Sequence, residues 1–406
     1  MANIGIVTTW FERGAAYVSR AYKEILSENN KVFIYARGGE EYAIGNPSWD
    51  LPEVTWGPWF SATRISMFHF YQWLKQNNIE IILFNEQRDM VPVKIAKELG
   101  FTVGAYVDFY TKDTISDFLV YDFLLCNTNR HYSVFKAHPC CYYIPWGVDL
   151  DVFNSRKNDD RILSDSITFF HSAGMGGVNL RKGTDLLIKA FSKVVSPARL
   201  IIHSQVGLEK YGDDIASLLA SDRRINFIHK TVPAPGLYYL GDVYVYPTRL
   251  EGIGLTICEA LSSGLPVVTT DSPPMNEFVI DGINGSLIRV KEQKYRQDNY
   301  YWPESFIDVD HLTEIMERYA SNRYIVMEQK RNAINLANER LDWNRNSFSI
   351  NSILSEFAGR GKKCNGVNCT HWFSWIIRHI YLYIDTFYHT RRIDKRSLRF
   401  KNQILL

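Results

Sequence analysis

The stretch PTRLEGIGLTICEALSSGLPVVTT, residues 247–270, decides how the second half of this 406-residue chain folds. Residues 243–246 before it predict a short buried strand. After Gly254 the apolar residues recur at helical spacing, and Gly264 is a residue type that often ends a helix. A strand that passes through a glycine turn into a helix leaves free backbone N–H groups, and the helix dipole there favours negative charge. We therefore expect an anion such as phosphate to bind at this turn.

Two carboxylates lie beside this predicted anion site. Glu251 precedes the helix and Glu259 lies within it. They would repel a bare phosphate, but carboxylates accept hydrogen bonds from the hydroxyls of a sugar or a ribose. The simplest ligand that offers both a diphosphate and hydroxyls is a nucleotide sugar.

A second glycine-rich stretch, SAGMGGVNLRKG at residues 172–183, lies between a predicted strand and a predicted helix. Its glycines, which permit tight backbone paths, are Gly174, Gly176, Gly177 and Gly183. Arg181 and Lys182 stand just before the helix, where two cations oppose the helix dipole unless an anion neutralises them. A diphosphate would do so, and the alternative is a solvated Arg-Lys pair.

The rest of the chain alternates predicted strands and helices, which is typical of doubly wound parallel sheets. The predicted strands are 3–8, 31–36, 79–84, 102–107, 123–127, 142–145, 167–171, 199–203, 225–229, 243–246 and 267–269. The predicted helices are 15–26, 65–76, 91–99, 184–194, 215–219, 256–262, 311–320 and 325–336. We expect an α/β protein with two tandem Rossmann-like domains and a C-terminal helical tail, because so long a chain exceeds one ordinary core.

Four segments follow from this pattern. Residues 1–155 are predicted to form an N-terminal Rossmann-like domain and residues 156–342 a C-terminal Rossmann-like domain that binds the nucleotide sugar. Residues 343–360 are expected to form a helix that crosses back to the first domain, and residues 361–406 a basic aromatic tail. Ligands in such sheets bind outside the carboxyl ends of the strands, so a cleft between two sheets is the expected site.

Charge is unevenly distributed. The formal net charge is +2, but residues 360–406 hold ten Lys or Arg and two Asp, which leaves the rest near −6. Nucleic-acid binding is disfavoured because positive charge is confined to the tail. The tail suggests contact with an anionic surface.

The start of the sequence shows no signal peptide, and no stretch holds about 20 uninterrupted apolar residues as a spanning helix requires. We therefore expect a cytoplasmic location and reduced thiols. The cysteines are Cys126, Cys140, Cys141, Cys258, Cys364 and Cys369. The Cys364-x4-Cys369 spacing matches no strong zinc pattern, and free tail cysteines are the favoured interpretation.

Residues 371–401 are apolar and aromatic first and basic afterwards. This order suits an interfacial helix on the inner face of a membrane, and Arg378 and Asp385 argue against spanning. The alternative is a helix packed on the first domain or on a second subunit.

Four motifs occur in one order: IPWGVDLDVF at 144–153, RKGTDLLIKAF at 181–191, YPTRLEGIGLTICEALSSGLPVV at 246–268 and EFVIDGINGSLI at 277–288. In these the chain resembles the family-4 retaining glycosyltransferases, which have the GT-B fold. The resemblance covers the entry to the second domain and most of that domain, and it is looser in the first.

The resemblance implies roles by position. Glu251 and Glu259 match the family's E-x7-E motif, the first acid on the transferred sugar and the second on the ribose. Arg181 and Lys182 match the cations on the diphosphate. The backbone at the start of the helix after Gly254 matches further phosphate contacts. Gly14 matches the glycine loop of the first domain, and Thr231 matches the loop beside the nucleotide base. The matched substrate-binding positions are Gly14, Arg181, Lys182, Thr231, Glu251, Gly254, Leu255, Thr256 and Glu259.

The chain departs from the family pattern at two places. Met175 follows Gly174 where the family often has Arg, so phosphate binding would depend on Arg181 and Lys182. Asp108 stands where many members have a His that faces the sugar. A carboxylate there can accept from a hydroxyl, and the alternative is a turn residue at a strand end. Asn85 and Glu86 follow the preceding strand and are similarly placed.

We expect Glu251, Asp108 and Lys182 to serve catalysis, with a nucleotide sugar as donor and neither metal nor cofactor. The expected acceptor is a saccharide or lipid-linked saccharide in cell-surface polysaccharide or glycolipid assembly. The alternatives are a nucleotide-sugar epimerase, a glycogen-type phosphorylase, and a catalytically silent sugar-binding scaffold at a membrane.

Overall fold

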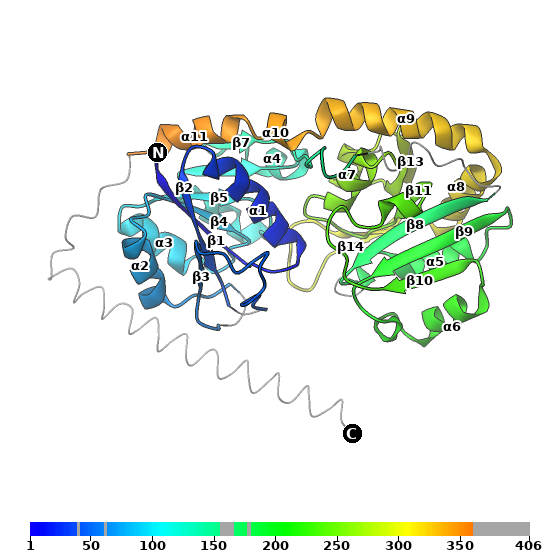
Figure 1. Ribbon diagram of the computed structural model, residues 1–406, viewed down its shortest axis with the longest axis horizontal. Coiled ribbons are helices and arrows are strands. Elements are labelled where there is room, and N and C mark those ends of the chain that lie inside the picture. Colours follow the sequence, from blue (N-terminus) through cyan, green and yellow to red (C-terminus); the bar gives the residue numbers. More distant parts are fainter. Residues whose placement is uncertain (39–40, 61–62, 155–165, 177–179, 360–406) are drawn as a thin grey trace, which may run out of the picture. The chain divides into compact units, whose positions relative to one another are not determined.

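The computed structural model describes residues 1–38, 41–60, 63–154, 166–176 and 180–359. Figure 1 shows the arrangement of their helices and strands. The predicted tail at 361–406, with Cys364 and Cys369, lies outside the described residues, and so does Gly177. Among the described residues, no helix combines the length and the apolar character that crossing a bilayer requires.

The first domain is built on a parallel sheet of seven strands in the order β3-β2-β1-β4-β5-β6-β7. Its strands are β1 (Asn3–Thr8), β2 (Lys31–Ala36), β3 (Val54–Trp56), β4 (Ile81–Asn85), β5 (Thr102–Tyr106), β6 (Phe123–Cys126) and β7 (Cys141–Tyr143). Its helices are α1 (Gly14–Ser27), α2 (Met67–Gln76), α3 (Val91–Glu98) and α4 (Asn129–Phe135), with a 3₁₀ helix at Lys112–Val120. The central strands β4 and β5 are buried throughout, as expected when helices cover both faces of a sheet.

The second domain repeats this plan on a parallel sheet of six strands in the order β10-β9-β8-β11-β12-β13. Its strands are β8 (Ile167–Gly174), β9 (Ala198–Ser204), β10 (Ile225–His229), β11 (Val243–Tyr246), β12 (Val267–Thr270) and β13 (Gly285–Ile288). Its helices are α5 (Thr184–Phe191), α6 (Asp213–Ser221), α7 (Leu255–Ser262), α8 (Val309–Ser321) and α9 (Arg323–Arg340). In both sheets the carboxyl ends of the parallel strands meet at one edge, which is where the predicted site residues lie.

The chain crosses between the domains twice, and the two crossings lie side by side. The N–H of Val148 donates to the carbonyl of Leu341 at 2.7 Å, and the N–H of Trp343 donates to the carbonyl of Val148 at 3.1 Å. After the second crossing, α10 (Trp343–Asn346) and α11 (Ser349–Phe357) lie on the first domain, where α11 packs against α1.

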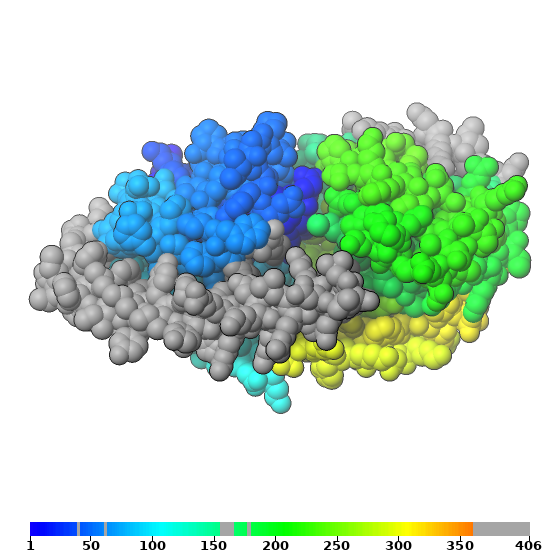
Figure 2. All heavy atoms as spheres, turned by 90° about the horizontal axis from the view of Figure 1, so that it is seen from below, coloured from blue at the N-terminus to red at the C-terminus, as the bar shows by residue number. Residues whose placement is uncertain are grey.

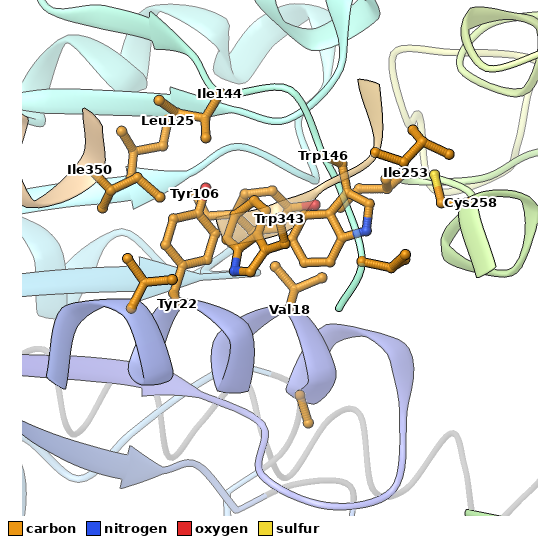
Figure 3. Close-up of a cluster of buried hydrophobic side chains, with 14 of the residues drawn as sticks. Val18, Tyr22, Tyr106, Leu125, Ile144, Trp146, Ile253, Cys258, Trp343 and Ile350 are labelled. Atoms are coloured by element: carbon orange, nitrogen blue, oxygen red, sulfur yellow. The ribbon is translucent and has the colours of Figure 1, made fainter. Parts of the chain in front are cut away.

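A continuous hydrophobic cluster lies at these crossings. Figure 3 shows the indoles of Trp146 and Trp343 side by side, with ring centroids 4.6 Å apart. Tyr22 contributes from α1 and Cys258 from α7, so the same cluster holds side chains of both domains. The second crossing is therefore anchored by apolar packing as well as by backbone hydrogen bonds.

A short antiparallel hairpin follows the second sheet. Its strands are β14 (Val290–Lys294) and β15 (Glu304–Ile307). In Figure 1 the loop between them, drawn in yellow, extends toward the first domain, and in Figure 2 yellow residues near 300 form one edge of the second domain's surface. The loop pairs with the first domain through an isolated bridge between Tyr300 and Thr111.

The predicted fold class of two tandem doubly wound domains is confirmed. The ranges predicted for β10 and β11 agree with the structure residue for residue. Among the described residues, five strands and α-helices were not predicted, namely β3, α4, β13, β14 and β15, and neither was the 3₁₀ helix at Lys112–Val120. The single helix expected at 343–360 is instead two, because the chain turns at Ser347 and Phe348 between α10 and α11.

Candidate functional site

Glu251 lies in the turn after β11, where several donors converge on one of its oxygens. Its Oε1 accepts hydrogen bonds from the hydroxyls of Tyr246 at 2.7 Å and Thr248 at 2.8 Å and from Lys182 at 2.9 Å. The guanidinium of Arg181 forms an ion pair with the same oxygen at 3.0 Å. The side chain is buried. No hydrogen bond to Oε2 is found within the described residues, so this oxygen can accept from a ligand hydroxyl.

Arg181 and Lys182 reach Glu251 because their loop is tied to the loop after β11. The carbonyl of Arg181 accepts a hydrogen bond from the N–H of Arg249 at 2.8 Å, and it lies 3.1 Å from the hydroxyl oxygen of Thr248. Gly183 adopts a left-handed φ of +73°, and a Cβ there would lie 2.0 Å from the carbonyl oxygen of Pro247. Only glycine permits this close approach, so the position fixes both cations near the acid.

Charge pairing inside this buried group changes its protonation. Burial alone would raise the pKa of Glu251, but Arg181 and Lys182 outweigh it and hold that pKa well below its usual range. Burial lowers the pKa of Lys182 to about 8, with a further contribution from Arg181, although Glu251 opposes the shift. The group at neutral pH therefore holds two cations and one carboxylate.

The start of α7 lies next to this group. Gly254 caps the helix in a left-handed conformation with φ +94°. Leu255 and Thr256 are the first helical residues, so their N–H groups are free of helix bonds. Gly14 begins α1 in the first domain, and a Cβ on it would lie 3.7 Å from the Cδ1 of Leu255. The structure thus places Gly14 beside the start of α7, two positions that the motif resemblance connects.

Glu259 lies within α7 and is half-buried. Its Oε2 accepts a hydrogen bond from the hydroxyl of Tyr238 at 2.6 Å. Burial raises its pKa. Lys182 acts electrostatically on it as well as on Glu251, so both acids of the predicted pair surround one cation.

On the first-domain side, Asp108 follows β5 and approaches the Glu251 turn. A Cβ on Gly252 would lie 2.6 Å from the Oδ1 of Asp108, so the carboxyl occupies the space that any side chain at 252 would need. Burial, together with the charge of Glu86, raises the pKa of Asp108 to about 7. Glu86 itself has φ +51° and forms an ion pair with Arg13 at 3.4 Å.

A small hollow in the first domain opens at these two carboxyls. It is lined by Phe84, Glu86, Gln87, Ala105, Tyr106, Asp108, Phe109, Phe118 and Tyr121. Its walls are mostly aromatic and its polar groups lie at the ends of β4 and β5. The free space in the hollow is about 10 Å³, which is close to the volume that one water molecule needs.

Two predicted positions do not join the group. Asn85 is buried and donates to the carbonyl of Ala15 at 2.9 Å and to the hydroxyl of Ser19 at 2.6 Å, so its amide connects β4 to α1. Thr231 is exposed in the loop after β10, and no contact described in the structure joins it to the two acids.

The sequence analysis missed Arg130, at the start of α4. Its guanidinium donates to the carbonyls of Glu251, Gly252 and Pro273 across the domains, and it is 3% exposed. It also missed Tyr300 in the hairpin loop, whose hydroxyl donates to the carbonyl of Asp108 at 3.1 Å. The position of Arg130, shortly after the predicted strand 123–127, was the available signal for that residue. Nothing in the local sequence marks Tyr300.

The comparisons with known proteins concern both the sequence and the fold. Residues 171–297 match the family model described as glycosyl transferases group 1. The similarity to this family is limited to these residues, which make up less than half of the chain. The matched segment contains Arg181, Lys182, Glu251 and Glu259, but it ends inside the loop between β14 and β15.

Among curated proteins, the chain is 25% identical over 227 residues to the lipopolysaccharide core biosynthesis mannosyltransferase LpcC of Rhizobium leguminosarum bv. viciae, covering 53% of this chain and 60% of LpcC. It is 24% identical over 228 residues to an uncharacterized glycosyltransferase of Methanocaldococcus jannaschii, covering 53% of each chain. The chain thus spans a little over half the length of these relatives.

Among solved structures, Anabaena HepE in complex with UDP and glucose superposes with a TM-score of 0.68 at 16% identity, covering 88% of this chain and 100% of HepE. WaaG, a glycosyltransferase involved in lipopolysaccharide biosynthesis, superposes with a TM-score of 0.62 at 15% identity, covering 86% of this chain and 99% of WaaG. At this identity the likeness shows the fold, which is GT-B.

Proposed function

We propose that this protein is a glycosyltransferase that moves a sugar from a nucleotide-diphosphate sugar to a saccharide or lipid-linked saccharide in lipopolysaccharide or other cell-surface polysaccharide assembly. The observation that carries the proposal is the convergence of Arg181 and Lys182 on Glu251, beside the free N–H groups that begin α7. This arrangement offers positive charge for a diphosphate and a carboxylate for hydroxyls at one place.

The donor would bind mainly to the second domain. The diphosphate would lie against Arg181, Lys182 and the start of α7, where cations and backbone N–H groups both favour negative charge. The second oxygen of Glu251 would accept from a hydroxyl of the transferred sugar. Glu259, half-buried on α7, would accept from the ribose.

In the reaction the bond between the anomeric carbon and the diphosphate oxygen breaks, and the acceptor oxygen bonds to that carbon. The acceptor proton passes to a basic oxygen, either on the leaving diphosphate or on Asp108. Negative charge develops on the leaving group, and Lys182 and Arg181 stabilise it without needing to reorganise. We propose retention of configuration, as in the family-4 enzymes that the motifs resemble.

The relatives guide the choice of donors for testing. LpcC is named a mannosyltransferase, and HepE binds UDP and glucose. We propose a hexosyl donor, and GDP-mannose and UDP-glucose are the first compounds to try. Binding of either donor would raise the thermal unfolding midpoint of the purified protein in a concentration-dependent way.

Glu251→Gln tests the proposed site. The amide keeps the shape of the side chain but removes the charge that pairs with Arg181 and Lys182, so we expect donor turnover to fall at least about a hundredfold. Release of the nucleoside diphosphate with and without acceptor saccharides measures it. Glu328→Gln, at an exposed position on α9, is the matched control. Equal turnover in both variants would refute the site. If the unmodified protein binds a donor but never turns it over, a catalytically silent sugar-binding protein is favoured.

We also propose that transfer needs no metal ion, because Arg181 and Lys182 supply the positive charge beside the diphosphate site. Turnover should then persist after extensive dialysis against EDTA and should not rise when Mg²⁺ or Mn²⁺ is restored. A strict requirement for added metal would contradict this part of the proposal.

The basic tail would bring the enzyme to an anionic membrane at its cytoplasmic face. Substituting Arg391, Arg392, Lys395 and Arg396 by Gln should abolish flotation of the full-length chain with vesicles rich in anionic lipid. Equal flotation of the unmodified and the substituted chains would contradict the proposed membrane contact.

A further inference from the structure

The loop between β14 and β15 makes a set of contacts with the first domain that neither the sequence motifs nor the family match explains. Its residues Tyr300–Trp302 pack on the segment that carries Asp108. The N–H of Tyr301 donates to the carbonyl of Tyr110 at 2.9 Å, and the indole N–H of Trp302 donates to the hydroxyl of Tyr110 at 2.6 Å. We call residues 295–303 the hairpin loop.

Tyr300 lies at the centre of these contacts and is 5% exposed. Its ring stacks on Phe109 with centroids 5.2 Å apart and an angle of 20° between the planes. Its hydroxyl donates to the backbone carbonyl of Asp108 at 3.1 Å and accepts from Arg130 at 3.3 Å. Tyr300 therefore contacts the backbone of Asp108 on one side and a cation on the other.

Arg130 continues this chain of contacts to the Glu251 turn. The guanidinium donates to the carbonyl of Glu251 and, at 3.4 Å, to that of Gly252. Its other terminal nitrogen donates to the carbonyl of Pro273 at 2.9 Å. A planar guanidinium can satisfy several acceptors in fixed directions, which a lysine cannot.

A second, parallel chain of contacts reaches the same turn through a histidine. His131 is fully buried, and its Nε2 lies 3.3 Å from the carbonyl of Gly252. With the proton on Nε2, this nitrogen donates to the carbonyl and Nδ1 accepts from the hydroxyl of Tyr110 at 3.1 Å. In the other tautomer Nε2 accepts from Arg130, whose nitrogen lies 3.5 Å away. Tyr110 in turn accepts from Trp302. With the proton on Nε2, each donor in this series of hydrogen bonds from Trp302 to Gly252 has one acceptor.

We propose that Arg130 and Tyr300 are positioning residues for sugar transfer, joining the backbone at Asp108 to the backbone at Glu251 and Gly252. The two residues hold the first-domain carboxyl against the turn that binds the donor sugar. This inference rests on the proposed function, and it assigns positioning roles to Arg130 and Tyr300, which both lie outside the matched family segment.

The experiment compares two tyrosines of the hairpin loop. Tyr300→Phe keeps the ring that stacks on Phe109 but removes the hydroxyl between Asp108 and Arg130. Tyr301→Phe removes a neighbouring hydroxyl that has no hydrogen bond among the described residues. We expect kcat to fall about tenfold in the first variant, the loss typical of one or two hydrogen bonds, and to stay within about twofold in the second. The KM for the donor should change little in either.

A double-mutant cycle with Asp108→Asn separates positioning from general damage to the fold. If Tyr300 acts through the carboxyl of Asp108, Tyr300→Phe should lower kcat by less than about twofold when Asp108→Asn is already present. Arg130→Lys is the second variant, since it keeps the charge but loses the fork, and it should show the same dependence on Asp108.

Three outcomes are distinguishable. Tenfold loss that disappears in the Asp108→Asn background supports the inference. Equal kcat in both tyrosine variants, or the same loss with and without Asp108→Asn, overturns it while wild-type transfer still stands. A wild-type protein that transfers no sugar overturns the proposed function, and with it the positioning role.

Discussion

At the scale of single residues, Lys182 makes the chemistry of the candidate site dependent on pH. Burial lowers its pKa to about 8, so a rise in pH above this value neutralises the side chain in the free protein. A bound diphosphate favours the charged form, so donor affinity should be constant below pH 8 and should weaken above it. The limiting slope is about tenfold per pH unit for loss of one proton.

Calorimetric titration with a nucleoside diphosphate between pH 6.5 and 9.5 measures this effect. Lys182→Arg should remove the alkaline decline, because a guanidinium stays protonated throughout that range. An affinity that stays flat to pH 9.5 in the unmodified protein would mean that the ammonium of Lys182 does not contact the diphosphate.

The grouping of Arg181, Lys182 and Glu251 was predictable because each belongs to a local strand–turn–helix pattern. The partners of Glu251 were harder to predict. Tyr246 belongs to a strand that is buried throughout, and nothing in the sequence tells which of its tyrosines turns toward the acid. The position of Asn85 was misjudged for a related reason, since a strand-end amide can face a ligand or a neighbouring helix.

At the scale of elements, α4 is capped by its own Thr128, whose hydroxyl oxygen accepts from the N–H of His131 at 3.2 Å, and by a carboxylate of the other domain. The carboxylate of Glu277 accepts hydrogen bonds from the N–H groups of Asn129 at 2.7 Å and Arg130 at 2.8 Å. These are two of the first N–H groups of the helix, which lack intrahelical partners. The cap also fixes the start of the helix that carries Arg130.

Glu277→Ala should therefore destabilise the protein by about 1 kcal/mol, the usual cost of losing a helix cap. The expected readout is a lower midpoint of urea unfolding, together with a lower kcat and an unchanged donor affinity. Glu328→Ala, at an exposed site on α9, is the control. Unchanged unfolding in the Glu277 variant would show that water replaces the cap without loss.

Element prediction succeeded where β-branched and aromatic residues fill a segment bounded by turns, as in β2 and β11. It failed for β3 and β13, because β3 has only three residues and β13 begins with a glycine and a serine, so neither offers an apolar run. The helix α4 was missed because its seven residues have little apolar periodicity, although its N-cap Thr128 is a local helix-start signal. The second group that caps it, Glu277, lies 148 residues away in the sequence.

At the scale of the whole molecule, Trp343 carries much of the packing at the crossings. It is 6% exposed, and its ring lies against Trp146 and, with centroids 5.5 Å apart, Tyr22. Trp343→Ala would leave a cavity in a cluster shared by both domains, at a cost of about 3–5 kcal/mol. We expect a large decrease in the thermal unfolding midpoint.

Phe348→Ala is the matched control, because Phe348 lies five residues further along and is 84% exposed. It should unfold at nearly the unmodified temperature. Similar midpoints for the two variants would show that the cluster around Trp343 contributes little to the joint stability of the domains.

The paired crossings at Val148 and Leu341 also restrict how the two domains can move. A single connecting strand could rotate freely about its own axis. Two crossings joined by a bridge resist torsion, because twisting one against the other would break the hydrogen bonds from Val148 to Leu341 and from Trp343 to Val148. We therefore expect the domains to separate by bending about these two crossings. Such a bend would move Asp108 away from Gly252 in one direction.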